Sequence, residues 1–153
     1  MPFRFTKTYD AGQAFSCVFR HHRASDNTEH LRGHRLEFTF VFEADQLDDS
    51  KRAVVPEIMS PLYSTLREWF YHTTIVAQDD PLLDELQHLH NRGAMSLVQM
   101  DHVGELAFAR HVWNLARDFL RITGLEWRVR CVETRCRYEG NTGIYMHTPA
   151  TTN

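Results

Sequence analysis

The stretch Arg35–Glu43, with the sequence RLEFTFVFE, determines the expected fold. Its positions Leu36, Phe38, Phe40 and Phe42 are apolar and alternate with residues that are mostly charged or polar. A period of two predicts a β-strand with one buried face. The aromatic stretch Ala14–Arg20 (AFSCVFR) before it predicts a hairpin partner, and the polar segment between them predicts a long connecting loop.

The segment after this hairpin has the pattern of an amphipathic helix. Apolar residues recur at helical spacing from Met59 to Phe70. Pro56 is compatible with a first helical turn, whereas Pro61 would interrupt a helix interior. We therefore expect the helix to begin at Pro61, with Ser60 as its N-cap.

A second, longer helix is predicted between Asp101 and Gly124. Asp101 is a suitable N-cap, and Gly124 is a suitable residue just beyond the C-terminus. The residues expected on its buried face are Leu106, Ala109, Trp113, Ala116 and Leu120. Between the two long helices we expect a short helix within Asp80–Asn91 and a brief strand at Ser96–Met100.

Two strands are predicted near the C-terminus. Glu126–Thr134 is expected to place Trp127, Val129 and Cys131 on one face, and Gly143–Met146 follows a charged loop, RCRYEGN. The order ββααββ predicts an α+β fold in which a four-stranded antiparallel sheet carries both helices on one face. We expect a partner subunit to bury the other face.

Length and composition predict one domain over residues 1–147, followed by a flexible tail at 148–153. The formal net charge of −3 leaves no basic excess for nucleic acid, and no stretch predicts a signal peptide or membrane span. The three cysteines form no CxxC pair, which favours reduced thiols in a cytoplasmic protein. Ten histidines suggest a metal site, since histidine is the commonest metal ligand.

Several short motifs resemble the 6-pyruvoyl-tetrahydropterin synthase and 6-carboxytetrahydropterin synthase family. The family patterns F-x-A-A-H, C-x-x-x-H-G-H and L-D-H correspond to Phe15–Phe19, Thr28–His34 and Phe70–His72. The patterns P-T-x-E, V-x-E-T and A-x-Y correspond to His102–Glu105, Cys131–Thr134 and Gly143–Tyr145. The resemblance implies a T-fold whose sheets join across subunits into a barrel, and a homohexamer that is a dimer of trimers.

The resemblance places Phe19, Arg32 and His34 at the positions of the family's three zinc-binding histidines. A phenyl ring has no lone pair for a metal, and arginine brings a permanent positive charge. One imidazole is too few for a catalytic zinc, which needs about three protein ligands. We therefore predict no zinc or other cofactor, with His34 as a vestigial ligand position.

A rearranged zinc site remains an alternative. His21 and His22 lie just beyond Phe19, and His30 lies four residues before His34. A set such as His21, His30 and His34 would restore zinc and the family's lyase chemistry, although its spacing matches no standard zinc motif.

The resemblance also implies a changed catalytic set. Thr28 stands at the position of the family's cysteine base, Tyr71 at that of its aspartate, and His72 at that of its histidine. A threonine hydroxyl does not ionise near neutral pH without a strong partner. If the chain is an enzyme, we expect His72 and Tyr71 to be its acid/base pair, with Arg32 replacing the charge of the metal.

The positions that recognise the pterin carry matching residues. By resemblance, Glu133, followed by Thr134, holds the amino and ring N–H edge of the pterin, and Glu105 supports this pocket. An ionised carboxylate accepts two parallel N–H bonds from such an edge. We therefore predict a pterin-binding homologue that does not catalyse the standard reaction. The alternative is an active, zinc-independent lyase on a dihydroneopterin-type substrate.

Arginines near the predicted loop suggest one more contact. Arg20, Arg23, Arg32 and Arg35 are suited to binding a phosphate of the substrate, because arginine pairs with phosphate bidentately. A solvated charged surface is the alternative interpretation for this cluster and for the loop RCRYEGN.

Overall fold

The computed structural model of the chain describes residues 3–10, 15–47, 49, 51 and 56–148, with only the backbone described for 56–59. The strands are β1 (Phe3–Tyr9), β2 (Phe15–Phe19), β3 (Arg32–Ala44), β4 (Thr73–Ala77), β5 (Leu97–Met100), β6 (Val129–Tyr138) and β7 (Asn141–Met146). The helices are α1 (Pro56–Phe70), α2 (Leu83–Asn91) and α3 (Glu105–Ile122), with a short 3-10 helix, η2 (Asn27–Glu29).

Within the described residues, the strands form one sheet with the order β5-β4-β2-β3-β6-β7, and β1 also pairs with β3. β1 and β2 follow one another along the same edge of β3, since Tyr9 pairs with Phe38 and Phe15 pairs with Leu36. Together with β3, β6 and β7 they form the antiparallel part of the sheet, in which β1 and β2 together take the place of one of the four predicted strands. The sheet continues beyond β2 through β4 and β5, which pair in parallel and lie outside the four-stranded sheet that was predicted. The sheet is open in the single chain, with β5 and β7 as its outer strands.

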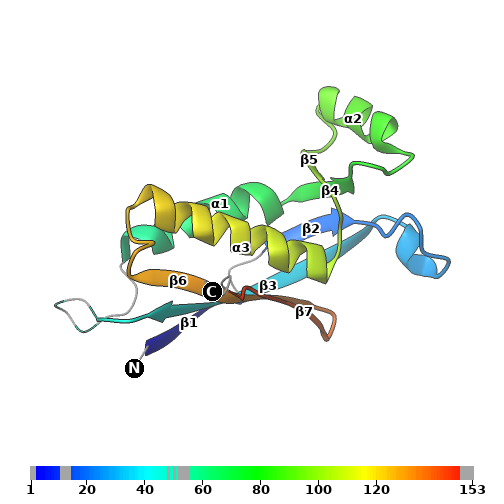
Figure 1. The fold of residues 1–153 in the computed structure, drawn as a ribbon. Coiled ribbons are helices and arrows are strands. Elements are labelled where there is room, and N and C mark those ends of the chain that lie inside the picture. Colours follow the sequence, from blue (N-terminus) through cyan, green and yellow to red (C-terminus); the bar gives the residue numbers. More distant parts are fainter. Residues whose placement is uncertain (1–2, 11–14, 48, 50, 52–55, 149–153) are drawn as a thin grey trace.

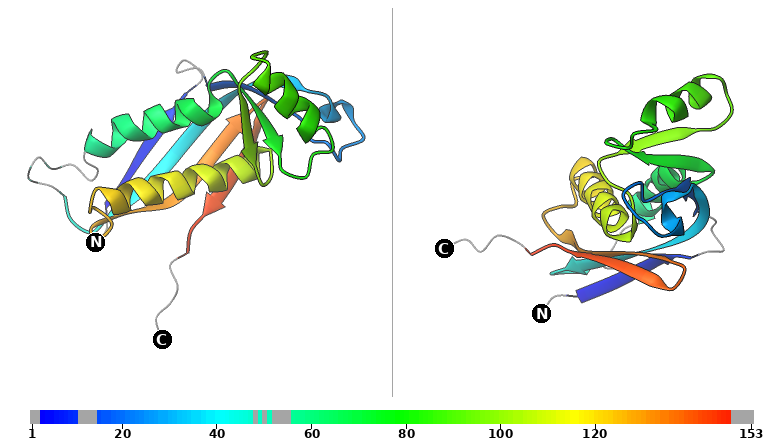
Figure 2. Two further views of the ribbon diagram at one scale, coloured as in Figure 1. Left: turned by 90° about the horizontal axis from the view of Figure 1, so that it is seen from above. Right: turned by 90° about the vertical axis from the view of Figure 1, so that its right-hand side faces the viewer.

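Helices α1 and α3 cover one face of the sheet, as predicted, whereas α2 lies apart from them, beyond β4 and β5 (Figures 1 and 2). The apolar positions of β3 face these helices, and Leu36, Phe38, Phe40 and Phe42 are fully buried. They pack against a buried face of α3 that includes Phe108, Val112 and Leu120. The core therefore lies between β3 and the two long helices, as the alternation of RLEFTFVFE implies.

The predicted start of the first helix was wrong. α1 begins at Pro56, and Pro61 lies inside it. Pro61 lacks an N–H and so removes one hydrogen bond close to the helix start, where several N–H groups have no helical partner anyway. Burial of Leu62, Leu66 and Phe70 outweighs this loss. The side chain of Met59 lies outside the described part.

The second helix also differs from the prediction at its start. α3 begins at Glu105 with Gly104 as its N-cap, so Asp101 lies outside it. Leu106 is 67% exposed instead of buried, because the buried face runs through Phe108 and Val112. Gly124 has a φ of 72° just after the helix, as expected of the residue that ends it.

The predicted charged loop RCRYEGN is a hairpin. Arg135–Tyr138 continues β6, and only Glu139 and Gly140 form the turn, with φ of 50° and 79°. Two consecutive residues with positive φ are typical of the turns that join tight hairpins. At the other end, Trp127 precedes β6 and is 75% exposed, so it does not share a face with Val129 as predicted.

A β-bulge in β6 sets which residues face the helices. Val41 pairs with Glu133 and Phe42 pairs with Cys131, so Val132 is an extra residue on β6. As a result, Cys131 and Thr134 both face the core, and Glu133 lies on the outer face of the sheet.

Other predictions concern the periphery. α2 and β5 form close to their predicted ranges, while β1 and β4 were not predicted. The predicted hairpin residue Ala14 lies outside the described residues, as does the predicted tail except for Thr148. No helix in the described ranges is long and apolar enough to span a membrane.

Candidate functional site

A cavity of about 250 Å³ lies where β3 and α3 begin and β6 ends. We call it the Glu105 cavity. Its lining comes from β2 and the following loop (Phe19, His21, Asp26, Thr28), β3 (Arg32, His34), α3 (Glu105) and the β6–β7 hairpin (Tyr138, Glu139, Asn141). The cavity therefore brings together segments that are far apart in the sequence.

Aromatic rings form one wall of the Glu105 cavity. The Phe19 and His34 rings stack with centroids 4.3 Å apart and an interplanar angle of 29°. The Tyr138 ring lies 5.1 Å from that of His34 and 5.4 Å from that of Phe19. This wall is buried, so a planar ligand would enter an apolar and largely preformed surface.

His34 carries an unsatisfied nitrogen at this wall. Its side chain is only 7% exposed, and Nδ1 lies 3.1 Å from an oxygen of Glu139. The geometry is not that of a hydrogen bond, so Nδ1 is buried without a hydrogen-bond partner. Burial lowers the pKa of His34, and the Glu139 carboxylate offsets this effect only in part. His34 is therefore neutral near pH 7.

Glu105 receives a hydrogen bond across the cavity. The Tyr138 hydroxyl donates to Oε2 of Glu105 over 2.7 Å. Burial by itself would raise the pKa of Glu105, but the bonds from Tyr138 and from its own backbone amide outweigh it, and the pKa is lowered. Burial and the Glu105 carboxylate raise the pKa of Tyr138. Glu105 is therefore an ionised acceptor held in place by a neutral phenol.

Thr28 is held by the residue that caps η2. The Asp26 side chain accepts hydrogen bonds from the backbone N–H of Thr28, over 3.1 Å, and from its hydroxyl. Both bonds lower the pKa of Asp26. Since the Thr28 hydroxyl already donates to a carboxylate, its role here is to fix the loop.

Ion pairs fasten this loop to the turn after β4. Arg20 Nε donates to Asp80 over 2.8 Å, and its Nη1 also donates to the carbonyl of Glu29 over 3.1 Å. Arg23 pairs with Asp79 at 2.6 Å. The segment that carries Asp26 and Thr28 is therefore clamped at several points.

The donors in the Glu105 cavity do not suit a zinc ion. Phe19 covers one face of His34, and the Arg32 guanidinium points toward the same Glu139 carboxylate, 4.0 Å away. Among the described residues, no three or more His, Cys, Asp or Glu side chains are grouped so that they could hold a metal ion. Of the three positions that the resemblance gives to zinc ligands, only His34 offers a lone pair, and Arg32 brings a fixed cation to another.

The rearranged histidine set is not assembled either. His21 lines the Glu105 cavity with His34, but the His30 side chain is 70% exposed and lies beside Glu29. His22 lies 3.5 Å from Asp79, in the neighbouring hollow that Asp79 also lines.

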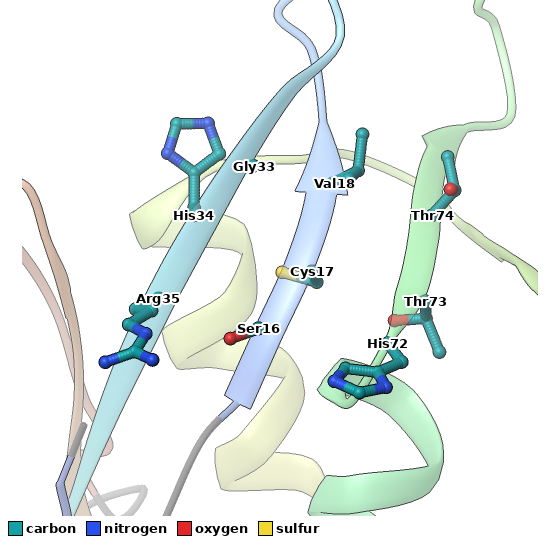
Figure 3. A pocket seen from close by; sticks show the side chains of 9 residues that line it. All are labelled: Ser16, Cys17, Val18, Gly33, His34, Arg35, His72, Thr73 and Thr74. Atoms are coloured by element: carbon teal, nitrogen blue, oxygen red, sulfur yellow. The ribbon is translucent and has the colours of Figure 1, made fainter. Parts of the chain in front are cut away.

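Of the predicted acid/base pair, His72 but not Tyr71 lines a different hollow, of about 410 Å³. The hollow is lined by Ser16, Cys17 and Val18 of β2, by Gly33, His34 and Arg35 of β3, and by His72, Thr73 and Thr74 (Figure 3). His72 has a φ of 54°, and its N–H donates to the carbonyl of Ser16 over 2.7 Å. The Tyr71 ring stacks on that of His72 at 3.9 Å, and Arg67 lies over Tyr71 at 4.2 Å.

Glu133 and Thr134 lie on opposite faces of β6. Glu133 lines a third cavity, of about 660 Å³, on the outer face of the sheet, where it accepts a hydrogen bond from Arg135 over 2.6 Å. Thr134 is fully buried, and its hydroxyl donates to the carbonyl of Ala109 over 2.5 Å. The substrate-binding role of Thr134 stays a prediction, and its contacts favour a structural role that ties β6 to α3.

The three cysteines are free and buried. Burial raises the pKa of Cys17 and of Cys131 to about 12, and that of Cys136 well above its ordinary value. None of them is therefore poised as a thiolate nucleophile.

No protein-family model and no curated protein sequence matches the chain. Its structure is similar to 6-pyruvoyl tetrahydropterin synthase from Plasmodium falciparum, with a TM-score of 0.66, 9% identity, and coverage of 95% of this chain and 98% of that one. The Plasmodium vivax enzyme gives a TM-score of 0.67 at 10% identity, covering 97% and 99% of the two chains.

The chain has the fold of these synthases. An uncharacterized protein from Wolinella succinogenes shares it too, with a TM-score of 0.78, 14% identity, and coverage of 97% and 99%. The T-fold expected from the short motifs is thereby confirmed. Since one fold hosts many activities, the function of this synthase-like chain is argued from its site.

Sequence reasoning identified Arg32, His34 and Glu105, which the synthase fold brings into one cavity. It missed the hairpin residues Tyr138 and Glu139. The signal for them was present: Cys136 and Tyr138 alternate with arginines up to the Glu139–Gly140 turn, which is a strand pattern.

Proposed function

We propose that this chain binds a pterin-like 2-amino-4-oxo heterocycle in the Glu105 cavity and does so without zinc. The observation that supports the proposal most is the convergence of five positions taken from the resemblance. Phe19, Thr28, Arg32, His34 and Glu105 all line one small cavity, although they come from three separate motifs of the chain. The likeness in fold to the Plasmodium synthases supports the same ligand class.

The chemistry of the cavity suits such a ligand. The Glu105 carboxylate, kept ionised by Tyr138, is an acceptor for the paired N–H groups of an amidine-like edge. The aromatic wall of Phe19, His34 and Tyr138 offers contact area to a flat ring. The Arg32 guanidinium supplies a positive charge at a position that the resemblance gives to a zinc ligand.

The proposal includes assembly of several copies of the chain, because Glu133 and His72 line cavities other than the Glu105 cavity. β1 and β7 each pair with a single strand within the described part of the chain, so each offers a free edge. We propose that these edges pair between copies into a homo-oligomer, a hexamer built as a dimer of trimers. Glu133 lies on β6, next to the free edge of β7, and would then act on a ligand shared between copies.

Fluorescence titration with neopterin tests the binding proposal. Wild-type protein should bind neopterin, and Glu105→Gln should weaken binding about 10- to 100-fold, because it removes a hydrogen bond to a charged group. Glu126→Gln is the matched control, since Glu126 is exposed at the opposite end of β6 from Tyr138. Absence of neopterin binding by the wild type, or an unchanged affinity of Glu105→Gln, would refute the proposal.

Two further measurements test the absence of zinc and the assembly of copies. Elemental analysis of protein purified without chelators should find less than about 0.1 zinc per subunit; a stoichiometric amount would refute zinc-free binding. Sedimentation velocity should show an oligomer, and Glu133→Gln should weaken neopterin binding only if copies assemble around the ligand. A monomer that binds neopterin normally would refute the assembly.

An active lyase is the second candidate, and the backbone of His72 favours it. A residue other than glycine with φ near +54° is strained, and such strain gathers at functional positions. His72, Tyr71 and Arg32 would then be the catalytic residues. Incubation with 7,8-dihydroneopterin tests this candidate, and no side-chain cleavage by the wild type would exclude it for that substrate.

A further inference from the structure

Carboxylates outnumber permanent cations in the Glu105 cavity. Asp26, Glu105 and Glu139 line it, and Arg32 is the permanent cation among its lining residues. Hydrogen bonds from Thr28 lower the pKa of Asp26, and the bond from Tyr138 helps to lower that of Glu105 against the effect of burial. Asp26 and Glu105 are therefore ionised near pH 7, and together they outweigh the charge of Arg32 when the histidines of the cavity are neutral.

Three of the four arginines that the sequence suggested for a phosphate lie against carboxylates, and the fourth, Arg35, lines the other hollow. Arg20 is bound by Asp80, a carboxylate that is only 1% exposed, and Arg23 is bound by Asp79. Arg32 itself lies 4.0 Å from the Glu139 carboxylate. A phosphate in this cavity would have to compete with carboxylates for each of these guanidinium groups.

The hydrogen-bonding groups of the cavity also disfavour a phosphate. An ionised carboxylate only accepts hydrogen bonds, and so do the oxygens of an ionised phosphate, whereas a ligand hydroxyl is able to donate. The buried Nδ1 of His34 has no hydrogen-bond partner, although it lies near Glu139 at this wall. A ligand hydroxyl is able to donate to the Glu139 carboxylate, whereas an ionised phosphate is not.

We infer that the Glu105 cavity selects ligands whose side chain carries uncharged hydroxyl groups and rejects those whose side chain is phosphorylated. This inference rests on the proposed binding of a pterin-like heterocycle and names its substrate class. A triphosphate places several negative charges beside Asp26, Glu105 and Glu139, and like charges held together are strongly unfavourable. A trihydroxypropyl side chain, as in neopterin, brings donors to Asp26 and Glu139 at no electrostatic cost, while Glu105 holds the ring edge.

Parallel titrations with neopterin and neopterin triphosphate test the inference. At about 0.15 M salt and without divalent cations, neopterin should bind at least 10-fold more tightly than its triphosphate. The ratio should fall in Glu139→Gln, because one repelling carboxylate is removed, and should stay unchanged in the control Glu126→Gln. In the wild type it should also fall as salt is raised, since salt screens repulsion between partly exposed charges.

The outcomes distinguish failure of the inference from failure of the proposed function. Equal affinity for both compounds, or tighter binding of the triphosphate, overturns the inference while leaving pterin binding intact. A preference that neither salt nor Glu139→Gln changes overturns the electrostatic cause. If the wild type binds neither compound, the proposed function itself fails. Thermal unfolding of Glu139→Gln shows whether it folds, and the salt series on the wild type decides the question if it does not.

Discussion

The ring of Phe19 stacks on the ring of His34, with centroids 4.3 Å apart. The resemblance assigns both positions to ligands of one zinc ion, and here one of them covers the face of the other. The contact turns a polar position into part of an aromatic wall. Burial at this wall lowers the pKa of His34, whose side chain is 7% exposed, and so favours the neutral imidazole.

Restoring the histidines should therefore restore metal binding. The double variant Phe19→His, Arg32→His gives an imidazole to each of the three zinc-ligand positions of the resemblance, His34 being the third, and removes a fixed cation. We expect it to retain close to one zinc per subunit after dialysis, measured by elemental analysis. Each single variant is the control and should retain less than about 0.1, so zinc in a single variant, or none in the double one, would show that the positions do not converge as described.

His72 should be more stable as glycine than as alanine. Its φ of 54° is costly for any residue with a Cβ, by about 1–2 kcal/mol, whereas glycine adopts it freely. Both His72→Gly and His72→Ala remove the ring that stacks on Tyr71, so the difference between them isolates the backbone. Urea denaturation should find His72→Gly about 1 kcal/mol more stable than His72→Ala. Equal stability of the two would mean that the backbone at this position is relaxed.

Gly143 should be intolerant of a side chain. A Cβ there would lie 2.4 Å from the backbone carbon of Glu105, so β7 and the start of α3 would have to separate. We expect Gly143→Ala to destabilise the chain by about 1–3 kcal/mol and to weaken neopterin binding by displacing Glu105. Gly33→Ala is the control, because nothing lies within 4 Å of a Cβ at Gly33. A loss of stability as large at Gly33 as at Gly143 would contradict this explanation.

The two ion pairs that hold the loop should contribute differently to stability, because only the pair of Arg20 with Asp80 is buried. Asp80 is 1% exposed and Arg20 is 14% exposed, so Asp80→Asn leaves a guanidinium with little solvent and no counter-charge. Removing one partner of a buried pair costs about 3–5 kcal/mol, and we expect a loss near the lower end because Asn retains hydrogen bonds. Asp79→Asn affects a pair whose members are both solvent-exposed and should cost less than about 1 kcal/mol. Denaturant unfolding compares the two, and similar losses would argue against the clamp.

Stability should fall as the pH drops below about 6.5. Burial lowers the pKa of His34 and of His111, so the unfolded chain binds protons that the folded chain does not in the range between the folded pKa values and the unfolded value of about 6.5. Each proton contributes a slope of at most about 1.4 kcal/mol per pH unit. His111→Gln should therefore reduce the slope measured between pH 7 and 5.5. An unchanged slope would show that protonation of His111 does not contribute to the loss of stability at low pH.

The central part of the fold could be predicted because its residues follow simple periods. The alternation of RLEFTFVFE gave β3, and the helical spacing of apolar residues gave α1 and α3. β4 was missed because Thr73–Ala77 is buried on both faces and has no alternation to detect. β1 does alternate, in Phe3–Tyr9, but its apolar residues are few and partly exposed.

The candidate site was predictable only in part, for a topological reason. Arg32, His34 and Glu105 were found through short motifs, and their proximity depends on the packing of α3 against the end of the sheet. Tyr138 and Glu139 join them because a two-residue turn carries β6 as far as this cavity. That turn has Glu139 at a positive φ, where Asn, Asp or Gly is the usual signal, so the hairpin was not recognised.

Val132, the extra residue of the bulge, determines where the strand β6 is able to change its length. Val132 adds one residue between two regular halves of β6, so deleting it would restore plain alternation and keep Cys131 and Thr134 on the core face. Deleting a residue elsewhere in β6, such as Arg135, would instead turn outward either Val129, Cys131 and Thr134 or Cys136 and Tyr138. Either outcome removes a set of buried side chains from the core, and the second also breaks the bond between Tyr138 and Glu105. A change of length is therefore compatible with the core at the bulge, whereas in the regular halves of the strand it would exchange the two surfaces at once.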